Sequence, residues 1–567
     1  MSPAKHRWIH PTIILVAIVV MVARIGSTWP IFNDTVDEPY HLGSGVALLE
    51  ARRHVHGIQH PPLARLVAAI PLWLSGVRLP EPWRDSTIHA DIDAFDVGDR
   101  LLMHGPWPYG TMLTRARAGM LLFAVLVVLY VYLLGRYIGS PLVGICSAVL
   151  VSTDPTLLGH GGLVGNDVAA AAGFLAALYH GTRFIARGNG RAAFAGGVAM
   201  GLGVACKFTA ALAAPALGLL LLSRRGRALI RGRLAAYRRA WPGAGALAIF
   251  LVTAFLSLWA TYFFDIGRLD DSASAVAGAA SWERIPRFLR HLPLPMPSAI
   301  LGLITLLEHN RAGHGAMYLN GQISTAGWWY YFPEAIVIKS PMSLSIGLLL
   351  AGTVALRRPR PRRIGVLLIP AMLFLLASMS SRVNIGVRHV LPVIPLLYLI
   401  IVHVLAGTRR RGIIVALMIL ALLETAWVHP DYLAFFNTLV GGPGNGDRYL
   451  LDSNLDWGQD QARARRWLAE HAKGRTVSLR VFGHPRLRQW PADGYQIVAA
   501  GEPARGLLLV SRNVFWGLYP CVYTDSQGRT RPEPDVSWAL DRLRPVARIG
   551  FSIDVYDLEP DTKRSGR

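Results

Sequence analysis

The chain has 567 residues, of which 52% are hydrophobic, and a formal net charge of +23 at pH 7. Its mean hydropathy is +0.36. Apolar runs of roughly 17 to 25 residues recur along it, long enough to cross the hydrocarbon core of a bilayer as helices. This pattern excludes an ordinary soluble protein and predicts a polytopic α-helical membrane protein. Cys146 and Cys206 fall inside apolar runs, so the cysteines imply no disulfide framework.

The positive charge would suggest a nucleic-acid partner if it lay on one folded surface. Instead, short basic segments without Asp or Glu separate apolar runs, at residues 5–7, 136, 183–191, 224–239, 357–363 and 409–411. Loops of this kind mark the cytoplasmic side of a membrane protein. The charge therefore reports topology, and no nucleic-acid partner is expected.

The apolar runs, in chain order, predict about eleven spans. The first run follows Lys5 and Arg7 and has no small-residue cleavage site behind it, so we expect a retained span rather than a signal peptide. An odd number of spans places the N-terminus in the cytoplasm and everything after Trp427 outside the inner (plasma) membrane. The predicted spans are 11–31, 114–134, 140–157, 166–186, 192–207, 209–222, 243–263, 334–355, 364–381, 390–406 and 412–428.

Two long segments, 32–113 and 264–333, are predicted to lie on the outer side. The first is the most acidic part of the chain and contains an apolar stretch, 61–79, that is interrupted by Pro71 and carries Arg65. A helix lying in the interface fits this stretch better than a crossing. The aromatic run 328–332 in the second segment indicates an interfacial belt.

After Pro430 the sequence becomes soluble in character. Short alternating stretches predict strands, and Asp460 to His471 predicts a helix. We expect two domains: a transmembrane domain over residues 1–429, which includes both outer segments, and a small α/β domain over residues 430–567 on the outer face.

Asp37 and Glu38 directly follow the first apolar run. Carboxylates so close to a membrane boundary are costly against lipid but can work in a cavity on the aqueous side. The alternative is that the two acids simply begin the next helix, where negative charge is favoured.

Further polar residues occur at the predicted outer ends of spans. Acids and cations in one cavity suit a displacement in which an acid deprotonates a hydroxyl and cations hold a phosphate leaving group. For a single Arg or Lys near a span end, snorkelling to the interface is an equally good explanation. These candidate residues are His60, Asp154, Asp167, Lys207, Lys339, Arg388 and His389.

Seven motifs together resemble the GT-C membrane glycosyltransferases. The nearest resemblance is to the bacterial phospholipid carrier-dependent enzymes of glycosyltransferase family 39, which are protein O-mannosyltransferase-like. The motifs are DEPYH (37–41), HPPLARL (60–66), DPTLLGHGGLVGND (154–167), GLGVACKFTA (201–210), YYFPEAIVIKSP (330–341), NIGVRHVLP (384–392) and the stretch 429–460, which contains LDSNLDWGQD.

The resemblance implies an inverting transferase that moves a sugar from a polyprenyl-phosphate donor to an acceptor hydroxyl on the outer face. It implies Asp37 as the catalytic base, Glu38 as a residue that positions the acceptor, and Arg388 at the carrier phosphate, with Lys207 and Lys339 behind it. Asp154 and Asp167 match the second acidic motif. The implied partners are the donor, membrane lipid and an acceptor that is a protein, a lipid or a glycan.

One departure from the family concerns the outer domains. Segment 264–333 is too short for the β-trefoil of eukaryotic relatives, so protein mannosylation does not follow. No cofactor is implied, although Asp452, Asp456 and Asp460, four residues apart, leave a divalent cation possible. The alternative function is a transporter or flippase for a lipid-linked or anionic glycan, which should carry charges in the middle of several spans.

Overall fold

The computed structural model describes most of the chain. The described residues are 3–54, 56–79, 94–230, 242–271, 280–283, 285–357, 363–408, 411–483, 494–498, 504–519, 523–524, 530–531 and 543–558. Parts of the predicted basic segments, 231–239, 358–362 and 409–410, lie outside these residues, as do residues 80–93 of the acidic outer segment. The end of the predicted strand at 494–500 is likewise outside them.

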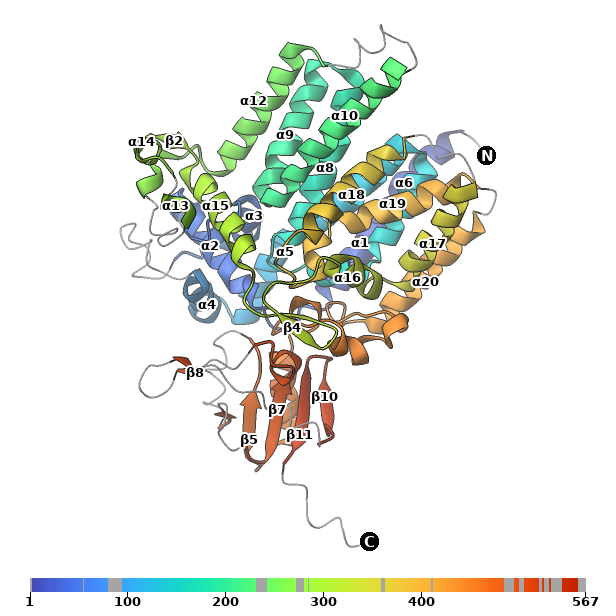
Figure 1. The fold of residues 1–567 in the computed structure, drawn as a ribbon. Helices are drawn as coiled ribbons and strands as arrows, with labels where there is room; N and C mark the ends of the chain where they lie inside the picture. The colour runs from blue at the N-terminus through green and yellow to red at the C-terminus, as the bar shows by residue number, and fades with distance from the viewer. Residues whose placement is uncertain are drawn as a thin grey trace.

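A body of helices makes up most of the described chain (Figure 1). Every predicted span overlaps at least one helix. The helices concerned are α1 (Pro3–Gly26), α5 (Tyr109–Ile138), α6 (Pro141–Ser152), α8 (Asp167–Arg187), α9 (Gly190–Cys206), α10 (Ala213–Ile230), α12 (Ala244–Thr261), α16 (Tyr331–Lys339), α17 (Met342–Arg357), α18 (Gly365–Met379), α19 (Val393–Ala406) and α20 (Gly412–Val428).

Three of these helices, α5, α8 and α12, are long and apolar enough to cross a membrane. Helices α16 and α17 meet that condition only as a pair, and they are bent by 112° with respect to each other. The other helices offer apolar stretches of only 10–17 residues. The count of eleven crossings therefore stays a prediction.

Prolines break two of the predicted spans. The span predicted at 334–355 ends its first helix before Pro341, and the span predicted at 140–157 is divided into α6 and α7 (Pro155–His160). Proline has no N–H to donate and disfavours helical geometry in the residue before it. Asp154 precedes α7 and caps it, accepting hydrogen bonds from the backbone N–H of Thr156 and Leu157 at 2.9 and 3.1 Å.

The two outer segments form shorter helices. The first contains α2 (Asp37–Ala51), α3 (Leu63–Leu74) and α4 (Ala94–His104), and the second contains α13 (Ala280–Glu283), α14 (Arg287–His291) and α15 (Pro297–Ala312). The interfacial helix predicted at 61–79 is thus confirmed as a helix but is shorter. Its Leu74 is 73% exposed.

The predicted aromatic belt is only partly a surface feature. Trp329 is 68% exposed, as a belt residue should be. Tyr331 and Phe332 are buried instead, because the chain turns inward at the start of α16 and both rings join the main core. Two short antiparallel strand pairs precede α16 in the chain: β1 (Ile266–Gly267) pairs with β2 (Leu294–Pro295), and β3 (Met317–Leu319) pairs with β4 (Gln322–Ser324).

A mixed sheet near the C-terminus follows the helical body. Its strand order is β10-β11-β7-β5-β6, in which β5 runs parallel to β6 and β7, and β11 runs antiparallel to β7 and β10. The strands are β5 (Val477–Arg480), β6 (Gln496–Ile497), β7 (Leu507–Ser511), β10 (Ala547–Ile549) and β11 (Ile553–Asp557). Helix α21 (Gln461–His471) lies where a helix was predicted. Figure 1 shows the sheet at the end of the helical body opposite the N-terminus.

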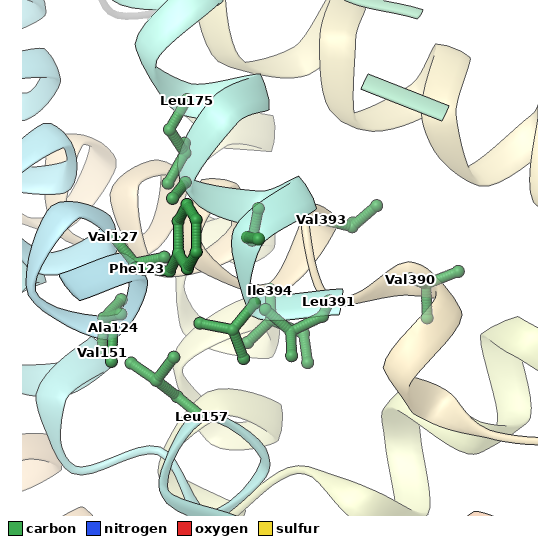
Figure 2. Packing of buried hydrophobic residues seen from close by; sticks show 14 of the residues in the cluster. Phe123, Ala124, Val127, Val151, Leu157, Leu175, Val390, Leu391, Val393 and Ile394 are labelled. Carbon is green, nitrogen blue, oxygen red and sulfur yellow. The ribbon is translucent and has the colours of Figure 1, made fainter. Parts of the chain in front are cut away.

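The main core ties the helical body to the short helix η3 (Val387–Val390). Side chains from α5, α6, α7, α8, η3 and α19 gather in one cluster, where Leu391 and Ile394 lie beside Phe123 and Leu157 (Figure 2). Between helices in a bilayer, such side chains stabilise the fold by close van der Waals packing, because lipid tails are as apolar as they are. The core therefore fixes η3 against the N-terminal ends of α7 and α8.

Helix α8 relates the polar and basic ends of the body. It begins at Asp167, ends at Arg187 and has 21 residues. At a rise of about 1.5 Å per residue it is about 30 Å long, which matches the hydrocarbon thickness of a bilayer. Asp167 and Arg187 therefore lie at opposite ends of a membrane-length helix, as the predicted topology requires.

We expect a cysteine at Arg187 to be labelled by a membrane-impermeant reagent only after cells are permeabilised, and a cysteine at His309 to be labelled in intact cells. Both positions are exposed, and the basic loops place the first inside. The measurement is maleimide labelling in a chain whose own cysteines are replaced by alanine. Labelling of Arg187→Cys in intact cells would show that the predicted topology is inverted.

Candidate active site

Four charged side chains from distant parts of the sequence meet at one end of the helical body. Nη1 of Arg388 lies 3.0 Å from Oδ2 of Asp37 and 3.5 Å from Oδ2 of Asp167. Nζ of Lys207 lies 2.5 Å from Oδ1 of Asp167. The two cations and two carboxylates form one continuous chain of ion pairs, which we call the ion chain.

Each residue of the ion chain lies at the end of a helix or between two helices. Asp37 and Asp167 are the first residues of α2 and α8. Lys207 is extended between α9 and the short helix η1 (Phe208–Leu212). Arg388 lies in η3, between the ends of α18 and α19. Polar groups are tolerated at such breaks, where the backbone does not face lipid.

Asp37 is the most exposed member of the ion chain. Its side chain is 29% exposed, against 9% for Arg388, 6% for Asp167 and 14% for Lys207. Solvent or a substrate can therefore reach Asp37 first. Its carboxylate pairs with Arg388 and not with the backbone at the start of α2, where no side-chain cap is present.

The loop before Asp37 is held by the segment 457–459. The N–H of Val36 donates to the carbonyl of Trp457 at 3.1 Å, and the N–H of Asn33 donates to that of Gln459 at 3.3 Å. The side chain of Asn33 adds a 2.8 Å hydrogen bond to Gly458. The last motif of the sequence thus fixes the position of the first.

The same motif surrounds Arg388. Its Nε donates to Oγ of Ser453 at 3.0 Å, and its guanidinium carbon lies 4.1 Å from the centre of the Trp457 ring. Burial alone lowers the pKa of Arg388, but the carboxylates of Asp37, Asp167 and Asp452 raise it overall. Arg388 therefore stays charged.

His60 and His389 lie beside the ion chain. Burial lowers the pKa of both imidazoles well below the usual value, and Lys207 lowers it further. Arg65 adds to this effect at His60, and Arg388 at His389. Both rings are therefore neutral near pH 7. A neutral imidazole can hydrogen bond to a sugar hydroxyl, but a pKa so low makes it a weak base.

Glu38 occupies a different environment from its neighbour. Its oxygens accept hydrogen bonds from Nε and Nη2 of Arg117 at 2.9 and 2.7 Å, and the two side chains are each 1% exposed. The backbone N–H of Val164 and Thr35 complete the set at 3.0 and 2.8 Å. This geometry favours a structural role for Glu38 over the predicted contact with an acceptor.

Two other predicted residues bind the protein itself. Asp154 caps α7 and also accepts a 2.9 Å hydrogen bond from the hydroxyl of Tyr398. Lys339 donates to the carbonyls of Leu433 and Asn454 at 2.8 and 2.5 Å. The structure brings neither side chain into the ion chain, so the geometry supports them as parts of the framework.

The three aspartates four residues apart also have separate partners. Oδ1 of Asp456 accepts from the N–H of Gly458 at 3.1 Å, and Oδ2 of Asp460 accepts from Oγ of Ser552 at 2.6 Å. Asp452 accepts from Tyr519. Within the described residues, no group of three or more His, Cys, Asp or Glu side chains is placed to hold a metal ion.

Arg117, Ser453 and Trp457 belong to this site although the sequence did not predict them as site residues. Arg117 was the one with a usable signal, because an arginine inside a predicted span is costly unless it has a partner. Ser453 and Trp457 belong to a motif that the sequence did mark, but their contacts with Arg388 depend on the folding of two remote segments.

The comparisons with known proteins fit the sequence motifs. Residues 109–261 match the model of a family described as dolichyl-phosphate-mannose-protein mannosyltransferase. This match confirms the resemblance to protein O-mannosyltransferase-like enzymes over residues 109–261, a range that includes Arg117, Asp154, Asp167 and Lys207. A comparison with curated proteins found no match.

Several solved structures are similar over parts of the chain. One is the S. cerevisiae protein O-mannosyltransferase Pmt1–Pmt2 complex bound to the sugar donor, with 17% identity, a TM-score of 0.33, and coverage of 45% of this chain and 33% of that chain. The match thus spans about a third of the yeast protein.

Two others are similar over nearly all of this chain. The archaeal oligosaccharyltransferase AglB from Archaeoglobus fulgidus, in complex with an inhibitory peptide and a dolichol-phosphate, has 12% identity and a TM-score of 0.41 over 95% of this chain and 75% of its own. ArnT from Cupriavidus metallidurans, bound to undecaprenyl phosphate, has 14% identity and a TM-score of 0.30 over 96% and 97%.

We expect Glu38→Gln or Arg117→Met to destabilise the protein by about 3–5 kcal/mol, because each leaves a buried charge or its partners unpaired. The double variant should lose less stability than the sum of the losses in the two single variants. Thermal unfolding in detergent measures this. Additive effects would show that the pair is not coupled.

The same pair predicts a pH dependence. Burial raises the pKa of Glu38, but Arg117 and the two backbone N–H groups lower it overall from its ordinary value of 4.5. The stabilisation is therefore fully present above pH 4.5 and is lost as the pH falls through the lowered value. Glu38→Gln should remove this acid-dependent loss.

Proposed function

We propose that this chain is an inverting glycosyltransferase that works on the outer face of the inner membrane. It moves a sugar from a polyprenyl-phosphate donor to an acceptor hydroxyl. The observation that carries the proposal is the ion chain: an accessible carboxylate, Asp37, held directly against a buried guanidinium, Arg388. The matched family description and the sequence motifs support the same class of reaction.

Asp37 is the proposed base. In a single displacement the acceptor hydroxyl attacks the anomeric carbon and loses its proton, which a base within hydrogen-bond reach must accept. Asp37 is the exposed carboxylate of the ion chain. Asp167 is held from two sides by Lys207 and Arg388, so its oxygens are already engaged.

Arg388 is the proposed ligand of the carrier phosphate. As the bond from the anomeric carbon to the phosphate oxygen breaks, negative charge grows on the phosphate, and a fixed cation stabilises it. A phosphate would also compete with Asp37 for the guanidinium N–H groups. Donor binding would then release Asp37 from its ion pair at the moment when a base is needed. Lys207, His60 and His389 complete the proposed pocket.

A transporter or flippase is the second candidate, because it too would use charged residues among spans. The residues brought together here lie at the ends of α2, α8 and α9 and in η3, not within the middle of the helices. A transport path would need charges at the bilayer midplane. The arrangement therefore favours the transferase.

Asp37→Asn should lower transfer at least about a hundredfold, because the acceptor loses its base. Binding of a polyprenyl phosphate should persist, since Arg388 and Lys207 remain. Transfer from a panel of polyprenyl-phosphate sugars in detergent measures the first effect, and donor-lipid binding the second. Asp96→Asn, an exposed acid on α4, is the matched control. Near wild-type turnover of Asp37→Asn would exclude this assignment.

Arg388→Ala should lower kcat/KM by about a hundredfold or more, because a preorganised cation at the leaving group is lost. Arg388→Lys should restore only part of it, since a point charge replaces a fork of N–H donors. Full activity in the lysine variant would move the phosphate site to Lys207.

A further inference from the structure

The C-terminal sheet has no part in the proposed chemistry so far, yet a series of contacts connects it with Arg388. The first contacts lie between η3 and the turn 452–454. Asn454 Oδ1 accepts from the N–H of Val387 at 2.9 Å, and Oγ of Ser453 donates to the carbonyl of Ile385 at 2.7 Å. The backbone before and at Arg388 therefore takes its position from this turn.

The turn has an uncommon backbone conformation at its first residue. Asp452 has φ +58°, in the left-handed region, which is uncommon for a residue other than glycine. Such a conformation persists only where surrounding contacts determine it. Asp452 also lies next in sequence to Ser453, whose hydroxyl accepts from Arg388. Whatever fixes Asp452 also fixes the partner of the guanidinium.

Two residues that follow β7 supply those contacts. Oδ1 of Asn513 accepts from the N–H of Asp452 at 2.9 Å, and its Nδ2 donates to the carbonyl of Asp456 at 2.8 Å. The hydroxyl of Tyr519 donates to Oδ2 of Asp452. Asn513 is 0% exposed and lies in the short helix α22 (Arg512–Phe515), which directly follows β7.

The sheet in turn fixes the two side chains. Asn513 follows the strand that lies between β11 and β5, and the ring of Tyr519 stacks on Phe482 with ring centres 4.7 Å apart. Phe482 comes just after β5. Both contacts to the turn thus come from residues held by the ends of β7 and β5, two neighbouring strands of the sheet.

We propose that the C-terminal sheet is a positioning element of the active site, in which Asn513 and Tyr519 hold the turn 452–454 and thereby orient Arg388. The expected effect on catalysis rests on the proposed function. The orientation of Arg388 by the sheet does not depend on that function. Among the described residues, the side-chain hydrogen bonds of Asn513 and Tyr519 go to Asp452 and Asp456 and not to a member of the ion chain, so both are positioning residues. A leaving-group cation displaced by about 1 Å can cost up to a hundredfold in rate.

The test uses the full-length chain in detergent with Tyr519→Phe and Asn513→Ala. Tyr556→Phe is the matched control, because it removes a buried hydroxyl of β11 that pairs with Asp554 and not with the turn. Hydrogen exchange of the peptide covering residues 385–391 reports the position of η3 without any need for activity. We expect faster exchange in both test variants and no change in the control.

Transfer kinetics give the second measurement. Tyr519→Phe should lower kcat about tenfold and leave the KM for the acceptor unchanged, and in an Arg388→Lys background the same change should cost less than twofold. Unchanged exchange at 385–391, or an equal loss of kcat in both backgrounds, would overturn the proposal. If wild-type protein transfers no sugar, the proposed function fails, and the exchange data alone decide whether the sheet orients Arg388.

Discussion

Arg388 carries a full positive charge on a side chain that is only 9% exposed, and a charge so buried is stable only beside opposite charge. Asp37 and Asp167 provide it, which joins the starts of α2 and α8 to η3. Lys207 forms an ion pair with the other carboxylate oxygen of Asp167. These electrostatic requirements draw together four segments whose paired residues are 40 to 351 positions apart in the sequence, and the site exists only where they are met.

A second buried pair supports the first. Glu38 and Arg117 have no exposed surface to share with a substrate, but they fix the loop from Asn33 to Asp37 against α5 and the segment before α8. The two neighbouring acids thus have different roles: Glu38 is held rigidly by its partners, and Asp37 stays accessible. Adjacent helical residues point about 100° apart, which allows this division.

Breaks in helices place the polar groups at one level. Pro155 begins α7 after a break in one apolar run, Pro341 follows the end of α16 in another, and Lys207 interrupts a third run between α9 and η1. Each break frees backbone groups that must find partners, and Asp154 accepts from two such N–H groups at the start of α7. The polar framework around the ion chain follows from these interruptions.

The sequence by itself indicated a helical membrane protein and the positions of its apolar helices, because hydropathy is a local property. It also marked Asp37, Asp167, Lys207 and Arg388 as candidates, because charged residues beside apolar runs can be recognised locally. It also placed strands and α21 in the C-terminal segment. Only the tertiary structure decided that Glu38 pairs with Arg117, that Asp154 and Lys339 bind the framework, and that Tyr331 turns inward. Those outcomes depend on which remote group lies within about 3 Å of each side chain, and no local pattern contains that distance.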